Sequence, residues 1–116
     1  MRGIVIAWSL AIAIVAPGAQ QSPAEPLRPT EDQLRLSAIE VARLVKLLEL
    51  TPGMTVADVG AGLGAWTLQF SRWTGPSGRV WATDIDGVPL RSLRALIARE
   101  QLSNVTVVEG APAATN

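Results

Sequence analysis

The stretch that decides the fold of this chain is Val56-Ala57-Asp58-Val59-Gly60-Ala61-Gly62-Leu63-Gly64. An apolar run reaches an aspartate, three glycines follow at alternate positions, and helix-compatible sequence continues from residue 65 to about 73. This order predicts a strand, a tight turn and a helix start. Glycines let the backbone adopt conformations that side chains forbid, and the free N–H groups at a helix start can bind a carboxylate or phosphate. The stretch therefore predicts a nucleotide-cofactor loop.

The sequence around this loop predicts further strands and helices in alternation. Upstream, apolar residues at helical spacing predict a helix from Thr30 to about Glu49, and Thr30 and Gln33 have the spacing of a capping box. Downstream, the pattern predicts a strand over 79–83, a helix that begins near 87–89, and a strand over 105–108. The first strand, 54–59, is a continuous apolar run, which is typical of a strand buried on both faces.

Alternating strands and helices imply parallel strands joined by right-handed crossovers. We therefore expect an α/β fold, a Rossmann-like parallel sheet with helices on both faces, which here stops after its third strand. Ligands of such sheets bind outside the carboxyl ends of the strands. Three loops reach that edge, at 60–64, 84–86 and 109–111, and we expect them to converge on one site.

Two aspartates narrow the choice of cofactor. Asp84 ends the second predicted strand, where a carboxylate can accept hydrogen bonds from ribose hydroxyls; a helix-capping role is the alternative, although Asp86 is better placed for it. Asp58 lies within an apolar strand, where a carboxylate is costly unless it is paired or hydrogen-bonded. It can serve a ligand that carries an ammonium and a sulfonium, or accept bonds from its own glycine turn, or both.

These residues together resemble the first motif of class I S-adenosylmethionine-dependent methyltransferases. The resemblance extends to 52–54 before the glycine loop, to 78–86 after it and to 104–110, and it covers about residues 31 to 111. It implies a Rossmann-like domain that binds S-adenosyl-L-methionine. The cofactor-binding residues that it implies are Asp58, Gly60, Gly62 and Gly64 for the methionine part, Asp84 for the ribose, Ile85 against the adenine, and Gly110 in the third-strand loop.

The chain departs from that family at two points. Many members carry an acidic residue after the glycine of the third-strand loop, whereas Ala111 stands there. The family domain also continues with a fourth strand, which pairs with the first. Without it, the outer edge of the first strand would be bare and open to another chain, so we expect a truncated product that needs its missing part or a partner.

The N-terminal part of the chain has a different character. We divide the sequence into a signal peptide or membrane anchor (1–21), a Pro-rich linker (22–29) and a partial methyltransferase domain (30–116). Residues 3–16 form an uncharged apolar run after Arg2, as in a secretory signal, and are the segment that would associate with a membrane. Export to the periplasm would conflict with a cofactor that is made in the cytoplasm.

Composition excludes several classes of site. The formal net charge is zero and the chain contains no histidine and no cysteine, which argues against a nucleic-acid groove, a thiolate metal site and a cysteine nucleophile. No metal is expected, and no residue is nominated as a catalytic base. Methyl transfer mainly requires that donor and acceptor be held in line, so this composition is compatible with it.

Three functions remain open at this point. The first is a methyltransferase, or the cofactor-binding portion of one, with an unidentified acceptor; the 116-residue chain alone is then expected to be inactive. The second is a non-catalytic nucleoside-binding fragment that needs a partner chain. The third is an NAD-linked oxidoreductase, because Gly60, Gly62 and Ala65 satisfy a loose dinucleotide pattern; Asp58 and Gly64 weigh against it.

Overall fold

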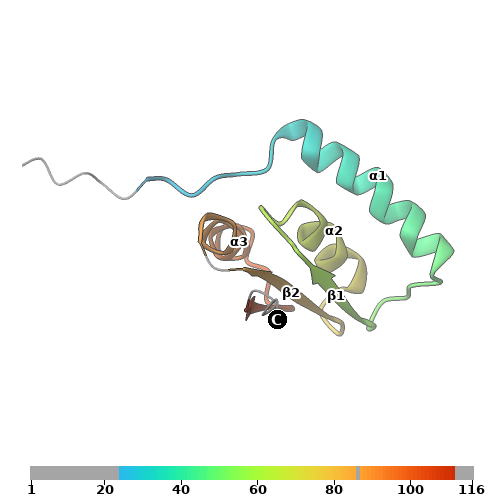
Figure 1. Ribbon diagram of the computed structural model, residues 1–116. Coiled ribbons are helices and arrows are strands. Elements are labelled where there is room, and N and C mark those ends of the chain that lie inside the picture. Colours follow the sequence, from blue (N-terminus) through green and yellow to red (C-terminus); the bar gives the residue numbers. More distant parts are fainter. Residues whose placement is uncertain (1–23, 86, 112–116) are drawn as a thin grey trace, which may run out of the picture.

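The computed structural model describes residues 24–85 and 87–111 (Figure 1). The predicted signal or anchor (1–21), Asp86 and the end of the chain lie outside these residues. The elements follow in the order α1 (Glu31–Leu47), β1 (Thr55–Val59), α2 (Ala65–Thr74), β2 (Arg79–Ile85), α3 (Val88–Arg99) and β3 (Val105–Gly110). Within the described residues, no helix is both long and apolar enough to cross a membrane.

The three strands form one parallel sheet in the order β1-β2-β3. The register pairs Val59 with Thr83 and Ile85 with Gly110, so the carboxyl ends of all three strands lie along one edge. The predicted α/β fold with parallel strands is therefore confirmed. Among the described residues β1 pairs with β2 alone, and its outer edge is bare.

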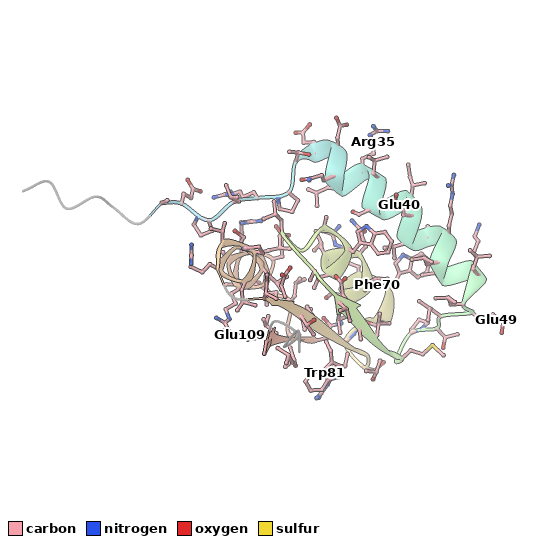
Figure 2. The ribbon with its side chains drawn as sticks, in the orientation of Figure 1. Arg35, Glu40, Glu49, Phe70, Trp81 and Glu109 are labelled. Carbon is pink, nitrogen blue, oxygen red and sulfur yellow. The ribbon has the colours of Figure 1, made fainter. Side chains whose placement is uncertain are left out.

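The helices α1, α2 and α3 all cover the same face of the sheet (Figure 1). Exposure alternates along β1, and Val59 is 81% exposed. Trp81 points to the uncovered side (Figure 2), and Val108 is also exposed. Burial of β1 on both faces, which its apolar run predicted, is therefore wrong for the described residues, because only one face of the sheet carries helices. The helices expected on the other face are not among these residues.

The hydrophobic core joins α1 and α2 to the sheet. Val41 and Val45 of α1 pack with Phe70 of α2 and Val80 of β2, all of them buried. Figure 2 shows Phe70 beneath α1, between that helix and the strands. Burial of such side chains contributes roughly 1.5–3 kcal/mol each, so this cluster fixes α1 on the rest of the domain.

The start of α1 has the predicted capping box. The Gln33 backbone N–H donates to Thr30 Oγ1 at 3.2 Å, and the Thr30 N–H donates to Gln33 Oε1 at 2.9 Å. Both bonds satisfy donors that the first helical turn leaves free. They fix the point at which α1 begins, and so the position of its first turns above the glycine loop.

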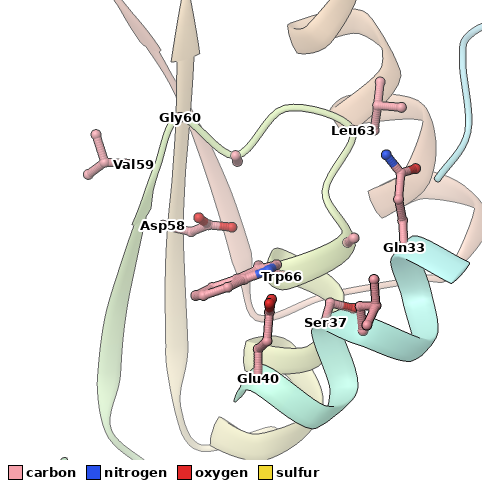
Figure 3. A pocket seen from close by; sticks show the side chains of 11 residues that line it. Gln33, Ser37, Glu40, Asp58, Val59, Gly60, Leu63 and Trp66 are labelled. Carbon is pink, nitrogen blue, oxygen red and sulfur yellow. The ribbon is translucent and has the colours of Figure 1, made fainter. Parts of the chain in front are cut away.

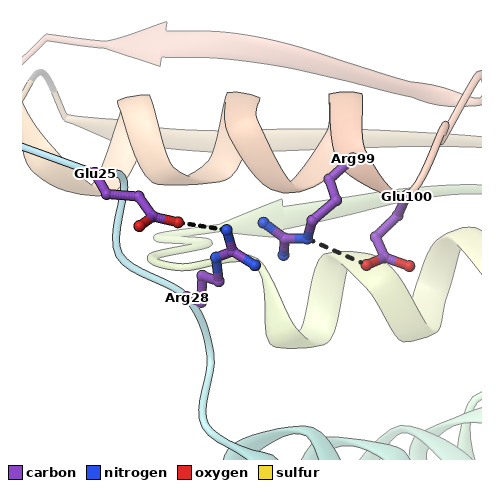
Figure 4. A network of polar contacts seen from close by, with 4 residues as sticks. All are labelled: Glu25, Arg28, Arg99 and Glu100. Carbon is purple, nitrogen blue, oxygen red and sulfur yellow. Dashed lines mark hydrogen bonds and ion pairs between the residues drawn. The ribbon is translucent and has the colours of Figure 1, made fainter.

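Residues 24–29 form neither helix nor strand and pass beside α3. Figure 4 shows two ion pairs here, one between Arg28 and Glu25 and one, at 3.4 Å, between Arg99 Nε and Glu100 Oε1. Exposed pairs of this kind contribute about 0–1 kcal/mol. Each pair joins residues close together in the chain, so neither ties this segment to α3, and both add little to stability.

Asn104 binds the end of α2 from a position just before β3. Its Nδ2 donates to the carbonyl oxygens of Ser71 and Gly75, at 2.9 Å each, and its Oδ1 accepts from the Ser71 hydroxyl. The last carbonyls of a helix lack partners within the helix. Asn104 supplies these partners and ties α2 to the start of β3.

Replacing Asn104 by alanine is expected to lower the free energy of unfolding by about 2 kcal/mol, because part-buried carbonyls lose their donors. Urea unfolding followed by circular dichroism measures this change. The exposed neighbour Ser103 provides the control, since Ser103→Ala is expected to change stability by less than about 0.5 kcal/mol. Equal effects of the two substitutions would contradict the role of Asn104.

Candidate functional site

The glycine loop turns back over β2 at the carboxyl edge of the sheet. Gly60, Gly62 and Gly64 have φ angles of 74°, 56° and 90°, a region that L side chains adopt only with strain. The N–H groups of Gly60 and Ala61 both donate to the carbonyl oxygen of Thr83, at 2.9 Å. The loop is thus bonded to the end of β2, beside Asp84.

The three glycines differ in what surrounds them. A Cβ added to Gly60 or Gly62 would have no atom within 4 Å, so the backbone there is open to a ligand. A Cβ added to Gly64 would lie 2.5 Å from Leu96 Cδ2 and 2.8 Å from Leu93 Cδ1. Gly60 and Gly62 therefore leave room for a ligand, whereas Gly64 is needed for the packing of α2 against α3.

Asp84 connects the glycine loop to the end of β2. Its Oδ2 accepts from the Gly62 N–H at 2.6 Å, and its Oδ1 accepts from the Ile85 N–H at 2.7 Å. A carboxylate has about four acceptor sites, so each oxygen can accept a further hydrogen bond. The structure thus places Asp84 and Gly62, two of the predicted cofactor residues, in direct contact.

Ile85 and Gly110 face each other as register partners on β2 and β3. Ile85 is 55% exposed, which leaves its side chain available to a ligand. A Cβ at Gly110 would lie 3.6 Å from the Asp84 carbonyl oxygen, an ordinary contact, so packing alone does not require glycine here. Ala111, which follows, is exposed.

Asp58 is held by a residue that the sequence analysis did not single out. The hydroxyl of Thr67, a buried side chain in the first turn of α2, donates to Asp58 Oδ2 at 2.6 Å. The sequence feature that could have indicated this contact is a small polar residue in the first turn of α2, where the other side chains are apolar. This bond orients the Asp58 carboxylate and partly offsets the cost of withdrawing it from water.

Substituting valine for Thr67 is expected to lower the free energy of unfolding by about 1–2 kcal/mol, because valine keeps the shape and removes the donor to a charged acceptor. Thr67→Ser keeps the hydroxyl and is expected to retain more of the stability. Thermal unfolding of the two variants makes the comparison. If valine proves no worse than serine, the hydrogen bond to Asp58 is not what Thr67 contributes.

A cavity of about 530 Å³ lies between α1 and the glycine loop, within the range of roughly 300–1,000 Å³ that small-molecule sites occupy. We call it the α1 cavity. Asp58, Trp66 and Glu40 point toward one another in it (Figure 3). Its lining residues are Gln33, Leu36, Ser37, Glu40, Asp58, Val59, Gly60, Ala61, Leu63, Ala65 and Trp66.

The predicted site residues thus fall into two groups. Asp58 and Gly60 line the α1 cavity, whereas Gly62, Gly64, Asp84, Ile85 and Gly110 do not. Glu40, on the polar side of α1, and Trp66, in the first turn of α2, complete the cavity. The glycine loop separates the two groups and borders both.

Comparison with protein families identifies the relationship. The family model described as protein-L-isoaspartate(D-aspartate) O-methyltransferase matches residues 24–113. The chain belongs to this methyltransferase family. The match covers every described helix and strand, so the glycine loop, Asp84 and the α1 cavity all lie within the part that defines the family.

Individual relatives of this family member are also methyltransferases. A probable cobalt-precorrin-6B C(15)-methyltransferase (decarboxylating) from Sulfurisphaera tokodaii is 30% identical over 81 residues, which are 70% of this chain and 39% of that protein. The crystal structure of a SAM-dependent methyltransferase from Aquifex aeolicus aligns with a TM-score of 0.60 at 30% identity, over 66% of this chain and 41% of the other. A protein-L-isoaspartate O-methyltransferase aligns with a TM-score of 0.58 at 25% identity, over 61% and 22% of the two chains.

The methyltransferase chain described here therefore spans well under half of the length of these relatives. Its part contains the glycine loop and the first three strands, the region that the resemblance in sequence had indicated. The comparisons confirm the class I S-adenosylmethionine-dependent methyltransferase fold.

Proposed function

We propose that this chain binds S-adenosyl-L-methionine and forms the cofactor-binding portion of a methyltransferase. The observation that carries the proposal is the contact of Asp84 with the Gly62 N–H, which joins the end of β2 to an open glycine loop. Membership of the methyltransferase family supports it. The cofactor supplies an electrophilic methyl group on a sulfonium, and the protein supplies its binding and orientation.

The residues at the carboxyl edge fit such a cofactor. Asp84 has acceptor sites left for ribose hydroxyls after its two backbone bonds. The backbone at Gly60 and Gly62 is free of neighbours on the side where a Cβ would stand, so the methionine part can approach it closely. In this proposal Asp58 faces the methionine ammonium, Ile85 covers the adenine, and Gly110 borders the adenine side.

Gly64 has a different role in the proposal from the one that the resemblance implied. A Cβ at this position would clash with Leu93 and Leu96, which supports a packing role. The backbone N–H of Gly64 donates to the carbonyl oxygen of Ala61 at 2.9 Å. We therefore propose that the backbone of Gly60 and Gly62 binds the methionine part, and that Gly64 maintains the conformation of the loop.

The proposal stops short of naming the acceptor. The family description names isoaspartyl protein, and the Sulfurisphaera relative is named for a cobalt-precorrin. The acceptors of these proteins differ in kind, and fold alone does not determine substrate.

Calorimetric titration of the purified chain tests the proposal. We expect S-adenosylmethionine and S-adenosylhomocysteine to bind, and NAD to bind more weakly or not at all, because the loop leads to Asp58 and the α1 cavity rather than to a second nucleotide site. Tighter binding of NAD would overturn the proposal in favour of an oxidoreductase. Absence of binding by all three would favour a fragment that is not competent to bind the cofactor alone.

A further inference from the structure

The α1 cavity is lined by residues other than those that we assign to the nucleoside. None of Asp84, Ile85 and Gly110 lines it, while Asp58 and Gly60 form its border with the glycine loop. If the nucleoside lies over the ends of β2 and β3, the methionine end reaches the cavity at Asp58. The remaining walls, which come from α1 and the first turn of α2, then face whatever receives the methyl group.

The walls of the cavity carry negative charge. Glu40 and Asp58 contribute carboxylates, and among the described residues neither a lysine nor an arginine lines the cavity. Thr67 occupies one oxygen of Asp58, whereas Glu40 rises from α1 toward the indole of Trp66 (Figure 3). At Glu40, a carboxylate on the acceptor would be repelled and a cationic group attracted.

Trp66 adds an aromatic wall whose orientation is fixed by packing. Its ring meets Phe70 edge-to-face, with centroids 6.0 Å apart at an interplanar angle of 64°, and Phe70 is buried in the core. Trp66 itself is 37% exposed, and it lines the cavity. A fixed indole beside carboxylates is the arrangement that binds organic cations through the face of the ring.

We propose that the α1 cavity receives the methyl acceptor, and that Glu40 and Trp66 make it select an acceptor with a cationic nitrogen group over one with a carboxylate. This inference rests on the proposed function, because it needs the methionine end of the cofactor at Asp58. It also separates this chain from the isoaspartyl acceptor in the family description, since that acceptor carries a carboxylate.

Two small probes of matched shape and opposite charge test the selection. Phenethylamine and hydrocinnamate are titrated separately into the full chain saturated with S-adenosylhomocysteine. NMR follows the indole N–H resonance of Trp66, which is assigned by its loss in Trp66→Phe. We expect phenethylamine to shift this resonance and hydrocinnamate to leave it unchanged. Equal or tighter binding of hydrocinnamate would overturn the inference without any variant being needed.

Glu40→Gln then tests the residue. We expect it to weaken phenethylamine binding about fivefold, an effect at the upper end for an exposed charge, and to leave S-adenosylhomocysteine affinity unchanged. Glu49 is exposed, lies just after α1 and does not line the cavity. Glu49→Gln is therefore the control, and we expect it to change neither the phenethylamine affinity nor the S-adenosylhomocysteine affinity. Unchanged amine affinity in Glu40→Gln, or an equal loss of S-adenosylhomocysteine affinity, would refute the inference. Failure of S-adenosylhomocysteine to bind the unaltered chain would instead refute the proposed function.

Discussion

Gly64→Ala is expected to lower the free energy of unfolding by about 2–6 kcal/mol, which can unfold a domain of this size. The new Cβ would lie 2.5 Å and 2.8 Å from methyl groups of Leu96 and Leu93, both of which are fully buried and cannot withdraw freely. Overpacking of a core costs about 1–3 kcal/mol, and a φ of 90° adds about 1–3 kcal/mol of backbone strain.

Gly62→Ala provides the matched control for this prediction. It makes the same chemical change two positions earlier, also at positive φ, but at a site where the added Cβ meets no atom within 4 Å. We expect a loss of about 1–2 kcal/mol from the backbone alone. Urea unfolding of both variants measures the difference. Equal losses would show that α3 adapts to the added methyl group and that Gly64 matters only for its backbone conformation.

The second large effect is expected on cofactor binding. Asp84→Asn should weaken S-adenosylmethionine about tenfold to a hundredfold, the cost of 1–3 kcal/mol for leaving polar partners unsatisfied. An amide NH₂ accepts no hydrogen bond, so asparagine keeps a single acceptor oxygen for the two backbone N–H groups that Asp84 binds and the ribose hydroxyls that we assign to it. Isothermal titration calorimetry of the folded variant measures the change in affinity.

Glu109→Gln controls for the loss of one negative charge at the same edge of the sheet. Glu109 is the register partner of Asp84 on β3, and it forms an exposed ion pair with Arg94 at 3.8 Å. Its amide variant is expected to bind the cofactor with nearly unchanged affinity. If the two variants lose affinity equally, general electrostatics and not a ribose contact explains the effect of Asp84.

The parts of the fold that depend on local pattern were predictable from the sequence. The capping box at Thr30 predicted the start of α1 to within one residue, and the helix that was expected to begin near 87–89 begins at Val88. The meeting of the loops at 60–64 and 84–86 was also predictable, because parallel strands end at one edge, and the hydrogen bond from Gly62 to Asp84 is formed there. Each of these features is set by residues close together in the chain or by topology.

Features that depend on how one helix or strand packs against another were not predictable. The apolar run of β1 was interpreted as a strand buried on both faces, but apolar composition does not say whether a second layer is present, and Val59 is exposed. Glu40 falls on the polar side of a helical pattern, and only the crossing of α1 over the glycine loop turns it into a wall of the cavity. Thr67 was missed for the same reason.

The strand order of the sheet also has a consequence for how the chain folds. Each strand pairs with the next one in the sequence, Thr55 with Arg79 and Val80 with Val105, so both pairings close loops of similar, moderate length. The entropy of loop closure rises only slowly with length, and no pairing here has to wait for a distant segment. A chain emerging from a ribosome can therefore add β2 to β1, and then β3 to β2, in the order of synthesis.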